Sequence, residues 1–211
     1  MPARWIQQGL RHPGCKPVVW LLCLAPAGWL LYGLLLGDGL GANPIEALLR
    51  ATGDWALRGL CIVLALTPLQ VVAGWTGLAR LRRLLGLFVF FYALLHALIY
   101  SALDMGWDWQ AIWADIVQRW FILAGVAAWC ILAVLAVTSW QTLQRALGGR
   151  VWKRIHQSVH VAAWLAVLHF YWMRSGKNNF AEVWVYAGIF AVLQLWRLWR
   201  KLRSRKATSV D

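Results

Sequence analysis

The run LLGLFVFFYALLHALIYSAL, residues 84–103, decides the class of fold. It contains no formally charged side chain. Its 20 residues are as many as an α-helix needs to cross the hydrocarbon core of a bilayer. His96 lies within the run. The run therefore predicts a membrane-spanning helix that carries a histidine.

Other apolar runs of comparable length lie on both sides of this one. They are Pro17 to Leu36, Trp55 to Gly74, Trp120 to Trp140, Ile155 to Trp172, and Val183 to Leu195, which residues 196–199 extend. The whole chain is 61% hydrophobic and 14% charged, against about a quarter charged in soluble domains. A soluble domain of this size would have no means of burying so much apolar surface. The sequence predicts an all-α integral membrane protein, a bundle of six transmembrane helices in a lipid bilayer.

The basic residues are divided unevenly between the two sides that six spans define. The side that carries both termini holds Arg4, Arg11, Lys16, Arg80, Arg82, Arg83, Arg145, Arg150, Lys153, Arg154, Arg197, Arg200, Lys201, Arg203, Arg205 and Lys206. The other side holds Arg50, Arg119, Arg174 and Lys177. Because basic loops stay in the cytoplasm, both termini are predicted to be cytoplasmic. The net charge of +13 is then a topology signal and predicts no nucleic-acid partner.

Three parts of the chain follow from this topology. Residues 1–16 are expected to form a cytoplasmic N-terminal segment, 17–199 the transmembrane domain and 200–211 a basic cytoplasmic tail. The longest connection, Gly37 to Asp54, is expected to be a loop with room for one short interfacial helix.

Histidine is the side chain within the spans that can bind a metal while neutral. His96 lies 12 residues into the third span and His169 lies 14 residues into the fifth, which runs in the same direction. At 1.5 Å per residue both lie roughly 18–21 Å from the inner boundary. Two imidazoles at one depth on facing helices are the ligands of a six-coordinate b-type haem. We therefore expect haem between the third and fifth helices.

Two more histidines begin the fifth span. His156 lies 13 residues before His169, about 20 Å nearer the cytoplasm, and His160 follows one turn later. The third span offers no second histidine at their depth, so a complete inner haem site is not visible. In an alternative interpretation, the histidines are the proton relay of a small transporter.

Several motifs resemble one known family. They are RRLLGL at 82–87, LLH at 94–96, LGGRVWKRIHQSV at 147–159, LHFYW at 168–172, GLGANP at 39–44 and LTPL at 66–69. Together they resemble the haem-binding membrane subunits of the bacterial periplasmic methionine sulfoxide reductase system, the MsrQ (YedZ) family. That family belongs to the ferric-reductase-like transmembrane group. The resemblance covers nearly the whole chain.

The resemblance implies a function. Members lie in the bacterial inner membrane, contain b-type haem and FMN, and take electrons from membrane quinol. They pass these electrons to a periplasmic molybdopterin-containing methionine sulfoxide reductase, which repairs oxidised envelope proteins. The family's haem-iron ligands correspond to His96, His156 and His169. His160 stands where members often have tyrosine, so its role as a ligand, a substitute or a filler stays open.

The C-terminal end bears on the source of electrons. Ferric reductases of the wider group carry a flavin and nicotinamide domain after the bundle. Here about 12 residues follow Trp199, with no GxGxxG unit. We therefore expect an electron-transfer subunit that has no catalytic residues of its own and receives electrons from another molecule.

Overall fold

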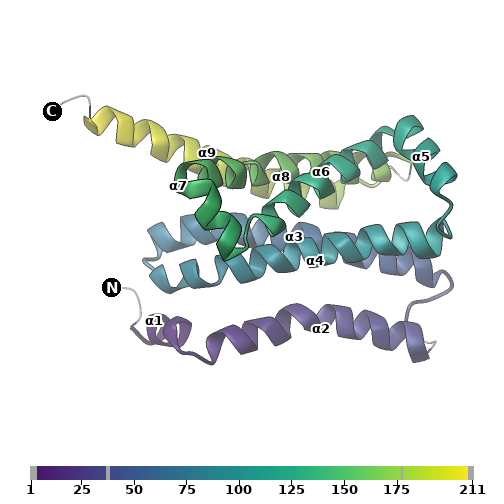
Figure 1. Ribbon diagram of the computed structural model, residues 1–211, viewed down its shortest axis with the longest axis horizontal. Coiled ribbons are helices and arrows are strands. Elements are labelled where there is room, and N and C mark those ends of the chain that lie inside the picture. Colours follow the sequence, from purple (N-terminus) through teal and green to yellow (C-terminus); the bar gives the residue numbers. More distant parts are fainter. Residues whose placement is uncertain (1–3, 37–38, 177, 209–211) are drawn as a thin grey trace.

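The computed structural model of the chain describes residues 4–36, 39–176 and 178–208, and its regular structure there is helical. Figure 1 shows long helices lying side by side, with α1 (Arg4–Arg11) and the end of α9 (Ala181–Thr208) at the same end of the bundle. The short helix α5 (Trp109–Gln118) lies at the opposite end.

Five helical segments of the described chain are long and apolar enough to cross a membrane. They are α2 (Cys15–Leu36), α3 (Pro44–Val72), α4 (Arg82–Ile99) with the π-helical turn η2 (Tyr100–Asp104), α6 (Trp120–Val137), and α9 from Ala181 to Ser204. The prediction of an all-helical membrane protein is thus confirmed, and each of these segments overlaps a predicted run.

The predicted span from Ile155 to Trp172 differs from the structure in its limits. It crosses the boundary between α7 (Gln141–Gln157) and α8 (Val159–Ser175). With 17 residues, α8 is about 26 Å long, a little less than the 30 Å of a hydrocarbon core. The sixth crossing therefore stays a prediction.

The expected loop from Gly37 to Asp54 was wrong in its second half, because α3 already begins at Pro44. Contacts between neighbouring residues determine where α3 starts. The side chain of Asn43 accepts a hydrogen bond from the Glu46 backbone N–H, and proline is favoured in the first turn, where its missing N–H has no partner to lose. The ion pair of Glu46 with Arg50 then supports the next turn.

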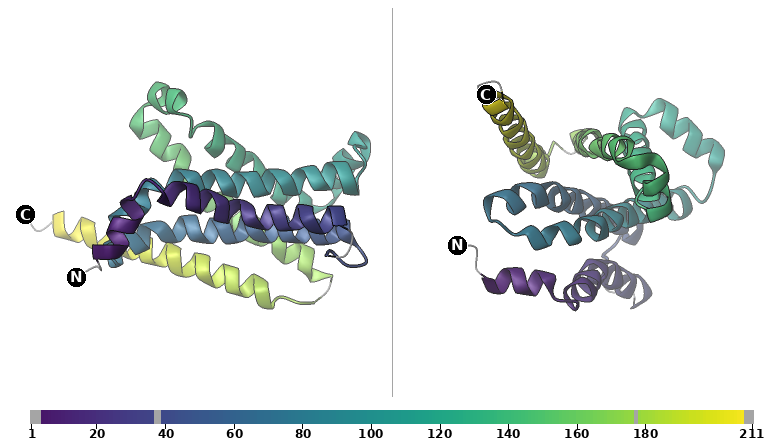
Figure 2. Two further views of the ribbon diagram at one scale, coloured as in Figure 1. Left: turned by 90° about the horizontal axis from the view of Figure 1, so that it is seen from below. Right: turned by 60° about the vertical axis from the view of Figure 1, so that its left-hand side comes forward.

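Two other predicted connections also contain helix. Asp108 caps α5 by accepting bonds from the backbone N–H groups of Gln110 and Ala111. The basic segment after Trp140 forms α7, which bends at Gly148, where φ is +72°. Figure 2 shows α7 standing away from the side of the bundle.

The core consists of two closely packed helix pairs, α3 with α4 and α6 with α8. Ala162 and Ala163 of α8 are completely buried, and such small residues let neighbouring helices approach closely. Contacts between α4 and α6 join the pairs, and α9 covers α3 and α8. The arrangement places the histidine-bearing α4 and α8 in one core.

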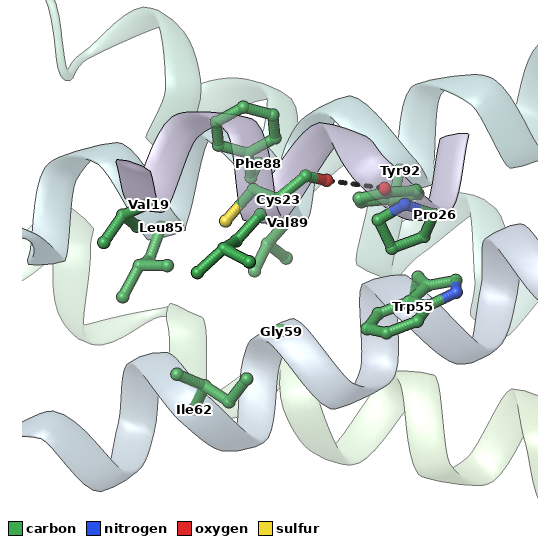
Figure 3. A pocket seen from close by; sticks show the side chains of 11 residues that line it. Val19, Cys23, Pro26, Trp55, Gly59, Ile62, Leu85, Phe88, Val89 and Tyr92 are labelled. Carbon is green, nitrogen blue, oxygen red and sulfur yellow. Dashed lines mark hydrogen bonds between the residues drawn. The ribbon is translucent and has the colours of Figure 1, made fainter. Parts of the chain in front are cut away.

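Among the described spans, helix α2 packs more loosely, mainly against α3 and α4. Its main polar attachment is the hydroxyl of Tyr92, which donates to the carbonyl of Cys23 at 2.6 Å and accepts from the N–H of Ala27 at 3.2 Å. Beside this contact lies a cavity of about 280 Å³ with almost entirely apolar walls (Figure 3).

Candidate functional site

The first candidate residue, His96, lies near the C-terminal end of α4, beside the N-terminal part of α3. Its Nδ1 is 2.9 Å from the carbonyl oxygen of Leu49 in α3. A carbonyl oxygen only accepts, so Nδ1 carries the hydrogen and Nε2 keeps its lone pair. Gly53 lies against the same ring: a Cβ on Gly53 would be 3.3 Å from both Nδ1 and Cε1 of His96.

The second candidate residue, His169 of α8, has equivalent surroundings on α6. Its Nδ1 is 2.6 Å from the carbonyl oxygen of Phe121, so Nε2 is again the nitrogen with the free lone pair. Gly125 lies against this ring, and a Cβ there would be only 2.8 Å from Nδ1. The phenyl ring of Phe121 lies beside the imidazole, with its centroid 6.0 Å away.

The structure brings these two rings together. The ring centroids of His96 and His169 are 6.1 Å apart, and the ring planes are inclined at 86°. A metal bonded to both would hold the two nitrogens about 4 Å apart, since each metal–imidazole bond is about 2 Å long, and the ring centres about 6 Å apart. The spacing, burial and tautomers of the pair thus fit two axial ligands of one haem iron.

His156 lies apart from this pair. It belongs to α7, which is not among the apolar spans. Partial burial lowers the pKa of its imidazole below the usual value. The Trp152 ring lies against it, with the centroids 4.1 Å apart. Its Nε2 is 3.3 Å from Thr138 Oγ1, and the structure brings no second histidine to it within the described residues.

His160, at the start of α8, is held by arginine. Nη1 of Arg197 in α9 donates to His160 Nε2 at 2.8 Å, and Nη2 donates to the carbonyl of Leu64 at 2.9 Å. Because a guanidinium has only donors, His160 Nε2 must accept, and the ring hydrogen sits on Nδ1. That Nδ1 is buried and has no hydrogen-bond partner among the described residues. With Nε2 engaged, His160 is not presented as a metal ligand.

A basic pocket lies at the end of the bundle that holds α1. Its volume is about 420 Å³, and its lining includes Lys16, Arg80 and Arg83 together with the ring of Trp20. Arg82 points elsewhere, donating to Gln70 Oε1 at 3.0 Å.

In the described chain, no group of three or more His, Cys, Asp and Glu residues is arranged to hold a metal ion by itself.

Sequence reasoning missed the partners of His96, His169 and His160, which are Leu49, Gly53, Phe121, Gly125 and Arg197. Backbone carbonyls leave no residue-specific signal, because every residue has one. The glycines do leave a signal, since glycine inside a helix costs about 1 kcal/mol relative to alanine and often marks a close approach. Arg197 was counted only among the basic residues on the side that carries both termini.

Comparison with known proteins gives a consistent answer. Residues 52–167 match the family described as ferric reductase like transmembrane component. The chain is 52% identical over 200 residues to the protein-methionine-sulfoxide reductase heme-binding subunit MsrQ of Polaromonas naphthalenivorans, covering 93% of this chain and 91% of the relative. The proteins of the same name from Ralstonia nicotianae and Rhodospirillum rubrum are 45% and 46% identical, covering 88% and 90% of this chain and 86% and 89% of each relative.

Proposed function

The chain belongs to the MsrQ family of haem-binding membrane subunits, and on that premise we propose that it carries electrons across the membrane. Electrons pass from membrane quinol, through b-type haem held by His96 and His169, to a periplasmic molybdopterin-containing methionine sulfoxide reductase. The observation that carries the proposal is the pair of neighbouring buried imidazoles, 6.1 Å apart at their centroids, whose Nδ1 atoms donate to carbonyls and whose Nε2 atoms keep their lone pairs. When bound, haem supplies one-electron redox chemistry.

The proposed topology has six crossings, with α8 as the fifth, and both termini in the cytoplasm of a bacterial inner membrane. The basic residues gathered at the end that holds α1 support this orientation. Exposed tryptophans gather at the α5 end, as in an interfacial aromatic belt: Trp107, Trp109, Trp113 and Trp120. The His96–His169 pair then lies in the periplasmic half of the bundle.

This topology is tested with reporter fusions. A reporter after Asp211 should be active only as a cytoplasmic fusion, and one inserted at Asn178 should be active only as a periplasmic fusion. An even number of spans and the charge distribution both require this pattern. The reverse pattern, or termini on opposite sides, would overturn the orientation.

FMN is proposed as a second cofactor, in the basic pocket near the cytoplasmic face. Lys16, Arg80 and Arg83 would attract the phosphate group, and Trp20 offers an aromatic face for a flat ring system. For each cation alone, a role in setting topology explains its presence equally well. The pocket's combination of three cations with an aromatic ring supports the flavin proposal.

The quinol donor is proposed to enter from the lipid. The apolar cavity between α2, α3 and α4 supports this part of the proposal, because its walls suit a hydrocarbon tail (Figure 3). Tyr92 in its wall is one helical turn before His96 on the same face of α4, which keeps the cavity close to the proposed haem.

His156 is proposed to contribute an inner relay. Electrons tunnel usefully only over short gaps, and His156 lies about 20 Å along the chain's helical path from His169. It also follows the basic residues of α7, which would attract an anionic donor or cofactor. At the other end, His169 lies close to the periplasmic surface, where a soluble partner would dock.

The function is tested by coupled reoxidation. The purified, reduced protein should be reoxidised rapidly when the periplasmic molybdenum reductase and methionine sulfoxide are both present. Omission of either the reductase or the sulfoxide is the matched control. If reoxidation is no faster with the partner than without it, the proposed partner is wrong, even where the protein binds haem.

A further inference from the structure

His96 and His169 contact their neighbouring helices in the same way. Each lies in what we call a seat, which is a backbone carbonyl together with the glycine four residues later. His96 donates to the carbonyl of Leu49, and the residue four positions later is Gly53. His169 donates to the carbonyl of Phe121, and the residue four positions later is Gly125. Both seats lie within the first three turns of a helix, α3 in one case and α6 in the other. The repeated spacing of four residues indicates a common steric requirement.

Helix geometry explains the requirement. The carbonyl of residue i already accepts the N–H of residue i+4, so a histidine that also uses this oxygen must approach it from the side. Side chains on a helix tilt toward its N-terminus, so that of residue i+4 covers the turn where the carbonyl of residue i lies. Glycine at i+4, which has no side chain, leaves this side open. The nearest imidazole atoms then lie 2.8 Å from the ideal Cβ position at Gly125 and 3.3 Å from that at Gly53.

The distances show that the two seats differ in tolerance. A Cβ on Gly125 would be 3.0 Å from Cε1 of His169 and 2.8 Å from its Nδ1, and the second distance is shorter than real Cβ contacts. A Cβ on Gly53 would be 3.3 Å from the nearest atoms of His96, which a small shift of the ring would relieve. The His169 ring is therefore the more strictly constrained.

Other helical glycines of the bundle provide a contrast. Gly86 in α4 and Gly188 in α9 have no heavy atom within 4 Å of an ideal Cβ position. They carry the same helix-propensity cost as Gly53 and Gly125 without a steric reason. These positions are therefore matched controls, on helices of the same bundle.

We propose that Gly53 and Gly125 are positioning residues that set the planes of the two axial imidazoles. Each glycine gives one ring access to a backbone carbonyl, and the two seats together incline the ring planes at 86°. The inference rests on the proposed haem site. Outer hydrogen bonds of this kind fix the tautomer and the orientation of a histidine ligand, and so tune the metal it binds.

The angle between the rings has a spectroscopic consequence. In ferric haem with two imidazole ligands, near-perpendicular planes bring two iron d orbitals close in energy and make the g tensor strongly anisotropic. Rings turned toward a common plane separate these orbitals and reduce the anisotropy. The largest g value in an electron paramagnetic resonance spectrum therefore reports the ring angle, and not merely the presence of haem.

The test compares Gly53→Ala and Gly125→Ala with Gly86→Ala and Gly188→Ala in the full-length purified protein. Haem content, helix content and the ferric electron paramagnetic resonance spectrum are measured for each. We expect Gly53→Ala to keep most of its haem with a smaller largest g value. Gly125→Ala should show a larger shift or lose most haem while remaining helical. The two control variants should match the wild type.

Each other result has a definite meaning. Wild-type spectra and haem content in both seat variants would overturn the seat proposal while leaving the haem site in place. Equal haem loss in all four variants would overturn it as well, since the effect would then be general. If Gly125→Ala does not fold, the milder Gly53→Ala decides. A colourless wild-type protein would instead refute the proposed function, and the seats with it.

Discussion

The histidines at the two ends of the bundle differ in which ring nitrogen is engaged. His96 and His169 are held through Nδ1 by backbone carbonyls, which leaves both Nε2 atoms free to bind a metal. His156 and His160 have their Nε2 atoms beside Thr138 and Arg197. The first pair therefore suits the proposed haem iron, whereas the second two would have to rearrange to bind a metal through Nε2. Histidine content alone does not reveal this difference, because it lies in the hydrogen-bond partners.

The largest effect should come from removing a member of the preorganised pair. His96→Ala or His169→Ala should each lose most of the haem, because the iron would lose one of its two protein ligands. His12→Ala is the control, since His12 is an exposed residue whose Nδ1 accepts the N–H of Gly14. Haem content is measured by absorption of the purified variants. Wild-type spectra in both core variants would show that the pairing is wrong.

A smaller effect is expected at the other end of the bundle. His156→Ala should slow reduction by a donor on the cytoplasmic side by roughly tenfold, equivalent to about 1.4 kcal/mol in the barrier. The haem at His96 and His169 should remain fully reducible by dithionite. Stopped-flow measurements on protein in vesicles distinguish slower reduction by the cytoplasmic-side donor from loss of the reducible haem. An unchanged rate would mean that electrons bypass His156.

The smallest effect on haem content and electron transfer is expected at the Arg197–His160 contact. His160→Ala and Arg197→Ala should each leave the haem content near that of the wild type, because His160 Nε2 is engaged by Arg197. Hydrogen bonds to charged groups contribute about 1.5–3 kcal/mol, so each variant should be less stable. A double-mutant cycle measured by thermal unfolding gives the coupling between them. If His160→Ala removed haem, His160 would be a ligand after all.

The lengths and positions of the apolar runs were sufficient to predict the helical membrane fold and the common depth of His96 and His169. Both follow from chain length, hydrophobicity and a fixed rise per residue, which need no knowledge of neighbouring helices. The fifth span was less well placed, because hydrophobicity did not separate the end of α7 from the start of α8. Helix starts such as Pro44 depended on capping, which a hydrophobicity pattern does not register.

The contacts that distinguish the two ends were not predictable in the same way. Arg197 reaches His160 from 37 residues away, and Leu49 lies 47 residues from His96. Such pairings depend on how the helices pack. Gly53 and Gly125 are recognisable in the sequence as glycines inside membrane helices. The histidines that they contact became evident only from the structure.

The proposed haem site places one iron between His96 of α4 and His169 of α8. Its most direct test is the absorption spectrum of the protein purified in detergent, oxidised and then reduced with dithionite. We expect a red protein with a Soret band, and the sharp reduced bands of a low-spin b-type haem with two histidine ligands. A colourless protein, as expected of a transporter that uses its histidines as a proton relay, would contradict it.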